Sequence, residues 1–134
     1  MERAFLDANV LFSAAYDPSC RLLGLWQLTN VELVASACVV AEACRNVSAK
    51  CPHRVENLSG LLERVKLVIE TGVGALPPGL NLPAKDVPVV EAALACDADV
   101  LLTGDKHFSR CFGRVIGGTL ILRPGDYLRM RQRR

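Results

Sequence analysis

Short apolar runs alternate along the chain with longer amphipathic stretches, and this alternation predicts strands that are each followed by a helix. Strands are expected at residues 4–6, 31–35, 65–69, 100–103 and 119–122. Helices are expected at residues 10–15, 21–28, 36–47, 55–64 and 124–134. One more helix is expected to begin at Asp86, and a short one is expected after Asp105. The pattern indicates an α/β fold with three layers, α/β/α, around a mostly parallel sheet of about five strands.

Residues 70–83 form the one long stretch without either periodicity, and they contain three glycines and three prolines. We expect a loop there rather than a linker, because the remainder of the chain is too short for a second domain. Residues 1–134 are therefore expected to form a single domain. Pro88 fits the first turn of the helix after Asp86, where a missing N–H costs nothing.

Composition narrows the class of protein. Apolar residues make up 51% of the chain, which excludes a disordered protein, and aromatic residues are too few for a base-stacking platform. The six cysteines contain no CxxC pair; Cys38, Cys44 and Cys96 lie in Ala/Val-rich stretches and are expected in the core of a reduced, cytoplasmic protein. The longest apolar stretch, residues 33–44, is too short to span a membrane and contains Glu42.

Four carboxylates border or interrupt these apolar runs: Asp7, Glu42, Asp86 and Asp105. Asp7 ends the first strand and Asp105 follows the fourth, so both are expected at the carboxyl edge of the sheet, where ligands bind in open α/β folds. An ionised carboxylate near a core is costly unless it is paired or binds a cation. Four that converge would form a site for a divalent metal and for phosphate chemistry.

Asp7, Asp86 and Asp105 each have a plainer interpretation, because Asp is a common N-cap between a strand and a helix. Glu42 does not fit it. It is predicted to lie in the middle of a helix whose apolar stripe is Val40, Cys44 and Val47, and no Lys or Arg lies four residues before or after it. We therefore expect Glu42 to need a cation or a hydrogen-bond donor.

The segments that hold these acids, FLDANVLFSA, VVAEACRN and KDVPVVEAALACDADVLLTGDKHF, resemble those of PIN domains. The likeness extends over nearly the whole chain and is greatest to VapC-type toxin ribonucleases and related small stand-alone PIN proteins. It implies that Asp7, Glu42, Asp86 and Asp105 are the catalytic residues that hold Mg²⁺ or Mn²⁺. Asn9 and Thr103 match polar positions that bind substrate or orient water; as turn residues they could equally satisfy backbone groups. Lys85 departs from the family, since many relatives have an acid there.

The resemblance implies a metal-dependent endoribonuclease, a toxin of a toxin–antitoxin pair, with RNA as substrate and an antitoxin as partner. The net charge of +2 includes the four acids, so the rest of the surface is more basic, which suits RNA. One alternative is a PIN-like module that binds RNA or protein without cutting. Another is an α/β phosphohydrolase of small molecules, although Asn9 and Leu11 break the Asp-x-Asp-x-Thr pattern of many such enzymes.

Several other residues are given structural interpretations. Asp97 and Asp99 precede the fourth strand and are expected at the opposite edge from the acids. His107 is interpreted as a solvated surface residue rather than a general base. Leu22, Leu25 and Trp26 are expected in the core, a contact with the antitoxin or with a second copy in a homodimer being the alternative. The arginines near the C-terminus would either contact RNA phosphates or favour the end of a helix and solubility.

Overall fold

The computed structural model of the chain describes residues 1–68, 76 and 80–132, and its centre is a six-stranded sheet. The strands are β1 (Glu2–Leu6), β2 (Val31–Ser36), β3 (Lys66–Val68), β4 (Val100–Leu102), β5 (Val115–Ile116) and β6 (Thr119–Leu122). Their order is β3-β2-β1-β4-β6-β5, and every neighbouring pair is parallel except β5 and β6. The expected mostly parallel sheet is confirmed, with one strand more than the pattern predicted.

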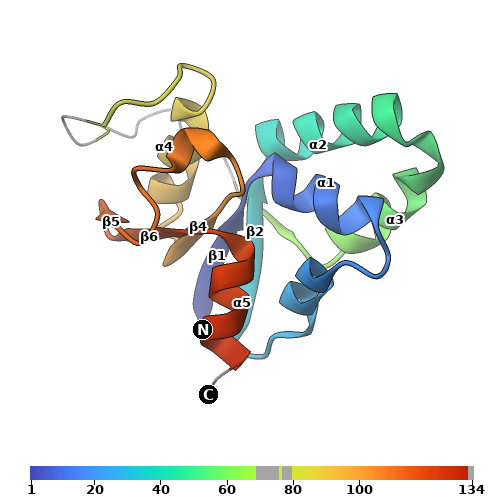
Figure 1. Cartoon of the computed structure of the whole chain (residues 1–134), viewed down its shortest axis with the longest axis horizontal. Helices are drawn as coiled ribbons and strands as arrows, with labels where there is room; N and C mark the ends of the chain where they lie inside the picture. Colours follow the sequence, from blue (N-terminus) through green and yellow to red (C-terminus); the bar gives the residue numbers. More distant parts are fainter. Residues whose placement is uncertain (69–75, 77–79, 133–134) are drawn as a thin grey trace.

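Helices lie on both sides of this sheet (Figure 1). The α-helices are α1 (Ala8–Tyr16), α2 (Ala37–Lys50), α3 (Val55–Leu62), α4 (Val87–Ala95) and α5 (Pro124–Gln132), and the 3₁₀ turns are η1 (Arg21–Gln27), η2 (Pro52–Arg54) and η3 (Lys106–Phe108). The first three helices pack together on one side, and α4 lies on the other. The expected α/β/α layering is therefore confirmed.

The two central strands, β1 and β4, are covered on both faces. Phe5, Leu6, Leu101 and Leu102 are fully buried, as expected for parallel strands between two helical layers. Leu6 pairs with Leu102, so the chain leaves both strands at the same level. After β1 the chain moves outward to β2 and β3, then returns to β4 on the other side of β1, so the switch point of the sheet lies between β1 and β4.

The buried face of α2 differs from the predicted one. Val39, Ala43 and Val47 are buried, whereas Cys44 is exposed and Val40 is only half-buried. The sequence of α2 has Ala, Val or Cys on nearly every side, so its periodicity does not fix which face packs on the sheet. The expectation of a core position is likewise wrong for Cys38, which is exposed; Cys96 is half-buried, and the two buried cysteines among the described residues are Cys51 and Cys111.

Two further segments differ from the expected elements. Residues 21–27 form 3₁₀ turns rather than an α-helix. Leu25 and Trp26 are buried as predicted, and Leu22 is half-buried. The strand β5 was not predicted; it pairs with β6 through a two-residue turn, Gly117 and Gly118, whose φ values of 57° and 89° favour glycine. Of the predicted strand at 65–69, residues 66–68 form β3, and Ile69 lies outside the described residues, as does most of the predicted loop at 70–83.

Among the described residues, no helix combines the length and apolar composition that crossing a bilayer requires.

Candidate functional site

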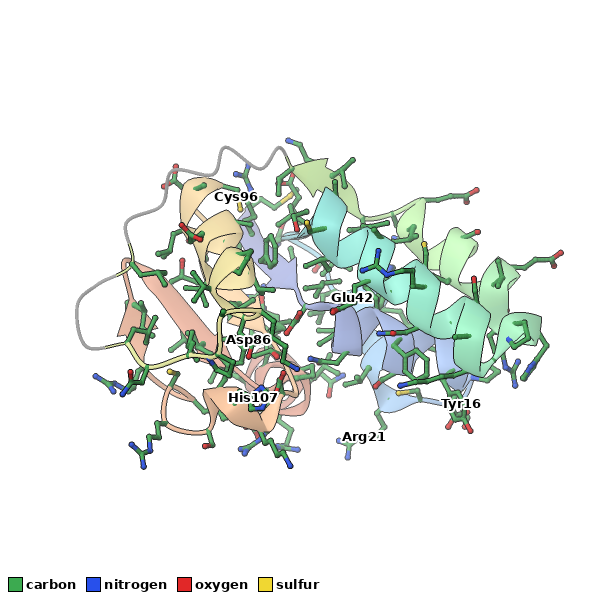
Figure 2. All side chains as sticks on the ribbon, turned by 90° about the horizontal axis from the view of Figure 1, so that it is seen from above. Tyr16, Arg21, Glu42, Asp86, Cys96 and His107 are labelled. Carbon is green, nitrogen blue, oxygen red and sulfur yellow. The ribbon has the colours of Figure 1, made fainter. Side chains whose placement is uncertain are left out.

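A cavity of about 250 Å³ opens where β1 and β4 end, and all four acids predicted from the sequence line it. Figure 2 shows Glu42 and Asp86 on opposite sides of it, on the α2 side and at the start of α4. The lining residues are Asp7, Asn9, Phe12, Glu42, Asn46, Lys50, Lys85, Asp86, Val89 and Asp105. Segments that are far apart in the sequence thus place their carboxylates around one space at the switch point of the sheet.

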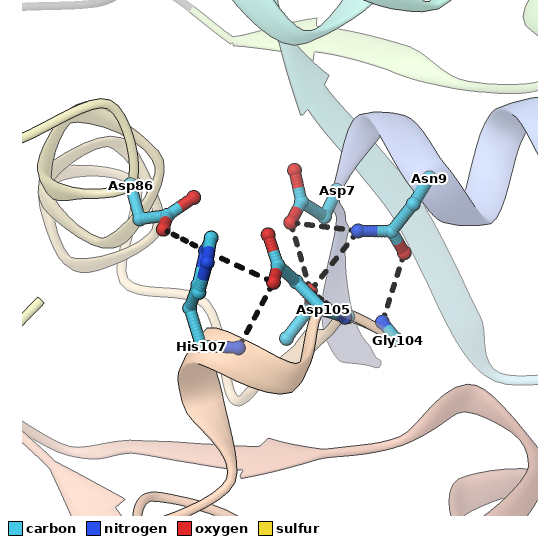
Figure 3. Close-up of polar contacts among 7 residues, drawn as sticks. Asp7, Asn9, Asp86, Gly104, Asp105 and His107 are labelled. Carbon is cyan, nitrogen blue, oxygen red and sulfur yellow. Dashed lines mark hydrogen bonds and ion pairs between the residues drawn. The ribbon is translucent and has the colours of Figure 1, made fainter. Parts of the chain in front are cut away.

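Asp7 lies at the base of the cavity and is nearly buried, with 5% of its surface exposed. It is the N-cap of α1, since its Oδ1 accepts a hydrogen bond of 2.8 Å from the Ala8 N–H. Its Oδ2 accepts hydrogen bonds from the Thr103 hydroxyl at 2.8 Å and from the Asn9 amide at 3.2 Å. The N-cap role therefore uses one oxygen and leaves the other oriented by two side chains (Figure 3).

Burial raises the pKa of the Asp7 carboxyl above its ordinary value. The hydrogen bonds from Thr103 and from the Ala8 N–H act in the opposite direction and lower the pKa, because they stabilise the charged form. The negative charges of Glu42 and Asp86 add to the rise. The fold thus disfavours the ionised form of Asp7 unless a cation enters the cavity, the result expected of carboxylates that converge without a counter-charge.

Asn9 and Thr103 connect the loop after β4 to the start of α1. The side-chain oxygen of Asn9 accepts the Gly104 N–H at 2.8 Å, and the Thr103 hydroxyl accepts the Asp105 N–H at 3.1 Å. The Asn9 amide also lies 3.3 Å from the Thr103 hydroxyl. Both residues therefore satisfy backbone groups, as one interpretation of the sequence had it, and both also hold the Asp7 carboxylate.

The carboxylates of Asp86 and Asp105 both contact the ring of His107. Asp86 occupies the N-cap position of α4 but its side chain caps no backbone N–H; its Oδ2 instead lies 3.0 Å from Nδ1 of His107. The same nitrogen is 3.1 Å from Oδ1 of Asp105, which also accepts the His107 backbone N–H at 2.9 Å. Figure 3 shows the ring between the two carboxylates.

His107 lies at the surface, as the sequence interpretation had it, with 34% of its side chain exposed. The sequence interpretation missed that its ring contacts two acids. Its position two residues after Asp105 was the available signal. An Asp that caps a short helical turn accepts the N–H two residues on, which brings that residue's side chain close to the carboxylate.

Glu42 is exposed, so the expectation that it is set among core residues is wrong, whereas its need for a cation stays a prediction. The reason for its exposure is the rotation of α2 described above, which buries Ala43 and leaves Glu42 at the edge of the cavity. Asn46 and Lys50 follow at one and two turns and line the same cavity. Glu42 nevertheless acts on Asp7 through its charge, which contributes to the raised pKa of that carboxyl.

The donor set fits a divalent cation. Oxygen or nitrogen atoms of Asp86, Asp105 and His107 lie within 4.8 Å of one another, and the carboxylate of Asp7 adjoins them. Carboxylate oxygens are the ligands that Mg²⁺ and Mn²⁺ prefer, and a few suffice because these ions retain several waters. Lys50 and Lys85 at the edge of the cavity add positive charge that could contact a phosphate group.

The other residues that sequence reasoning weighed lie away from the cavity. Asp99 accepts the Arg3 N–H at 2.8 Å, at the amino end of β1, so the prediction that it lies at the opposite edge is confirmed. Of the C-terminal arginines, Arg129 forms an ion pair with Asp126. Nη1 of Arg131 lies 3.6 Å from Oε1 of Glu2. Residues 133 and 134 lie outside the described residues.

A scan of the sequence against protein-family models gives no match. A search of curated proteins also gives none.

Solved structures do resemble the chain. A structure of VapBC2 from Rickettsia felis bound to a DNA fragment from its promoter matches with a TM-score of 0.63 and 20% identity, over 90% of this chain and 98% of the other. A structure of VapBC-1 from nontypeable Haemophilus influenzae matches with a TM-score of 0.60 and 17% identity, over 92% and 98%. Identities this low establish the fold alone. The chain therefore shares the fold of these VapBC structures, which agrees with the PIN-like fold that its sequence motifs suggested.

Proposed function

We propose that this chain is a metal-dependent endoribonuclease in which Asp7, Glu42, Asp86 and Asp105 hold Mg²⁺ or Mn²⁺ and take part in phosphodiester hydrolysis. The observation that carries the proposal is the meeting of four acids from separate elements in one cavity, with two of them, Asp7 and Asp86, nearly buried. Such a group of carboxylates is unfavourable without a positive charge among them. We therefore infer that the four carboxylates at the switch point of the sheet serve to bind a cation.

A bound divalent cation would neutralise the phosphoryl oxygens and make a water molecule nucleophilic. The protein's part is to position the ligands. Thr103 and Asn9 direct Oδ2 of Asp7, so Asp7 is the central ligand, and the Thr103 hydroxyl also holds the backbone of Asp105. Lys50 and Lys85, at the edge of the cavity, would contact the phosphates on either side of the bond that is cleaved.

A second cavity favours a polymeric substrate over a small phosphate ester. It measures about 460 Å³, and Lys106, His107, Arg110 and Arg114 line it. His107 also contacts Asp86 and Asp105, so this basic cavity adjoins the acidic one. Within the described part of the chain, Lys106, Arg110 and Arg114 form no ion pair of their own, so their charges are available to a chain of phosphates.

We further propose that the protein is the toxin of a toxin–antitoxin pair that acts in the cytoplasm. The support is its likeness in fold to structures named VapBC. An antitoxin segment would cover the acidic cavity, and an arginine placed among the carboxylates would occupy the place of the cation. A homodimer remains a prediction from the sequence.

The test is cleavage of structured and unstructured RNAs with Mn²⁺ or Mg²⁺, comparing the wild type with Asp7→Asn. Asp97→Asn is the matched control, because it removes the same charge from a turn residue outside the cavity whose φ of 54° Asn also adopts. We expect Asp7→Asn to lose cleavage and Asp97→Asn to retain it. Equal cleavage by all three proteins would indicate a contaminating nuclease and would contradict the proposal.

The same preparations distinguish the alternatives. Turnover of a small phosphate ester without any cleavage of RNA would favour the phosphohydrolase. Binding of RNA without cleavage at any concentration of Mn²⁺ or Mg²⁺ would favour the non-catalytic module.

A further inference from the structure

His107 occupies a position that the four-acid site does not account for. Its ring nitrogen Nδ1 lies 3.0 Å from Oδ2 of Asp86 and 3.1 Å from Oδ1 of Asp105, and these residues form the one group of potential metal ligands found among the described residues. Two carboxylates and an imidazole are a more varied donor set than carboxylates alone.

The spacing of these atoms matches that of adjacent ligands on one ion. Ligand atoms about 2.1 Å from a six-coordinate cation lie about 3 Å from their neighbours. We propose that Nδ1 of His107 is a direct ligand of the divalent cation, together with Asp86 and Asp105. The nitrogen makes the site prefer Mn²⁺ or another transition-metal ion to Mg²⁺. This inference rests on the metal site of the proposed function and specifies its chemistry.

The preference follows from the nature of the donor. Mg²⁺ binds oxygen almost always and retains its waters, whereas imidazole is a common ligand of transition-metal ions, and Mn²⁺ accepts both nitrogen and oxygen. Replacing one water by an imidazole nitrogen therefore favours Mn²⁺ and leaves Mg²⁺ with a poor ligand.

The fold holds the ring in place before any cation binds. The backbone N–H of His107 donates to Oδ1 of Asp105 at 2.9 Å, and the next residue, Phe108, is fully buried and anchors η3. On the other side, the Asp86 carboxylate caps no backbone N–H of α4, so it is available as a ligand. A preorganised ligand set of this kind binds with little loss of conformational entropy.

The alternative is that His107 serves as an internal cation, an ion pair that satisfies Asp86 and Asp105 when no metal is present. The two roles predict opposite results on removal of the ring. If His107 is a ligand, its removal weakens the binding of Mn²⁺. If His107 instead competes with the cation, its removal strengthens the binding of both Mn²⁺ and Mg²⁺.

Pulsed electron paramagnetic resonance of bound Mn²⁺ tests the contact directly, because a coordinated imidazole nitrogen couples to the electron spin of the ion. We expect this ¹⁴N coupling in the wild type, and we expect its loss in His107→Gln and in His107→Ala. His53→Gln is the matched control, since His53 is the only other histidine in the chain and lies exposed in η2. It should retain the coupling.

Calorimetric titration of the same proteins gives the second readout. We expect His107→Gln to lose about 10-fold or more in affinity for Mn²⁺ and to change much less in affinity for Mg²⁺. Mn²⁺ that binds to the wild type without nitrogen coupling, or a variant that binds both ions more tightly, would overturn this inference and leave the proposed function intact. A wild type that binds Mg²⁺ but no Mn²⁺ would likewise overturn this inference alone, and a wild type that binds neither ion would overturn both.

Discussion

The carboxylate of Asp7 is held more firmly than any other acid of the cavity. One oxygen caps α1 and the other accepts hydrogen bonds from Thr103 and Asn9, while nearly all of the side chain is buried. These contacts fix its direction, but they do not offset the cost of its burial, and the pKa of the carboxyl is raised. The residue is thus built to receive a positive charge.

The raised pKa of Asp7 predicts how stability depends on pH in metal-free protein. The folded state holds the proton more tightly than the unfolded state, so the contribution of Asp7 to stability is fully present below pH 3.8 and is lost as the pH rises through the folded pKa. Asp7→Asn has no such loss. Between pH 3.8 and the folded pKa, the free energy of unfolding of the variant should therefore rise relative to that of the wild type, by at most about 1.4 kcal/mol per pH unit. Urea denaturation in a chelator measures both.

Saturating Mn²⁺ is the control for this titration. It should raise the stability of the wild type at neutral pH and leave that of Asp7→Asn unchanged. A stability difference between the two proteins that stays constant from acid to neutral pH would contradict the raised pKa.

The hydroxyl of Thr103 predicts an effect on activity without a change of charge. It donates to Asp7 and accepts the Asp105 N–H, so Thr103→Val should loosen two ligands at once. Residues that orient metal ligands typically contribute a factor of about 10 to 100 in metal affinity or activity, and we expect a loss of that size in RNA cleavage.

Thr119→Val is the matched control for Thr103→Val. Thr119 is also buried, and its hydroxyl donates to the Ala98 carbonyl at 2.7 Å, so the variant should lose about 1–3 kcal/mol of stability and retain cleavage at a permissive temperature. Equal losses of cleavage in the two variants would mean that stability, not the position of Asp7, determines the effect of Thr103.

At the scale of the elements, the ends of the strands and helices decide where the acids meet. Asp7 follows the last residue of β1 and Thr103 follows the last residue of β4. Because Leu6 and Leu102 are paired, Asp7 and Thr103 lie at the same level of the sheet. The turn η3 brings Asp105 and His107 toward the first residue before α4, Asp86. The site is therefore a product of the sheet register and of two helix starts.

Two glycines predict opposite effects on the stability of these elements. A side chain at Gly117 would approach Leu94 to 2.8 Å at a φ of 57°, so Gly117→Ala should lower the free energy of unfolding by about 1–2 kcal/mol. Gly60 lies in α3 with open space around it, so Gly60→Ala should raise the free energy of unfolding by about 1 kcal/mol. Chemical denaturation of both variants checks the pair, and a neutral or stabilising Gly117→Ala would contradict the hairpin.

Much of this architecture was predictable from local patterns. Strands such as β1 and β4 are short apolar runs followed by an acid, and the mostly parallel sheet followed from the alternation of strands with helices. The rotation of α2 was not predictable, because apolar residues surround that helix, and so the exposure of Glu42 was missed. The strand β5 consists of two residues, too few for any periodicity. The contact of His107 with Asp86 depends on how two distant elements pack, which a linear pattern does not contain.

At the scale of the whole molecule, the cavity that holds the four acids adjoins a cavity lined by basic side chains. The acids line one, and Lys106, Arg110 and Arg114 line the other. A modest net charge of +2 thus conceals a basic surface beside an acidic centre. This arrangement suits a phosphate polymer whose backbone rests on the basic surface while one phosphate lies over the metal.

The basic cavity predicts the salt dependence of RNA binding. In the Asp7→Asn background, which should bind RNA without cutting it, Arg110→Ala and Arg114→Ala are each expected to weaken binding. Each should also reduce the slope of log affinity against log salt by about 0.7, the value for one phosphate contact on a single strand. Arg64→Ala is the control, since Arg64 lies by a different cavity near the amino ends of β1 and β2. If the dependence of affinity on salt is unchanged in both Arg110→Ala and Arg114→Ala, the RNA does not bind along the basic cavity.

Calorimetric titration of Mn²⁺ into metal-free protein tests the central claim most directly, because the proposed chemistry requires that Asp7, Glu42, Asp86 and Asp105 hold a cation together. We predict saturable binding to the wild type and to Asp97→Asn, and its loss in Asp7→Asn and Asp86→Asn. A wild type that takes up neither Mn²⁺ nor Mg²⁺, or an Asp7→Asn variant that binds as the wild type does, would contradict the account.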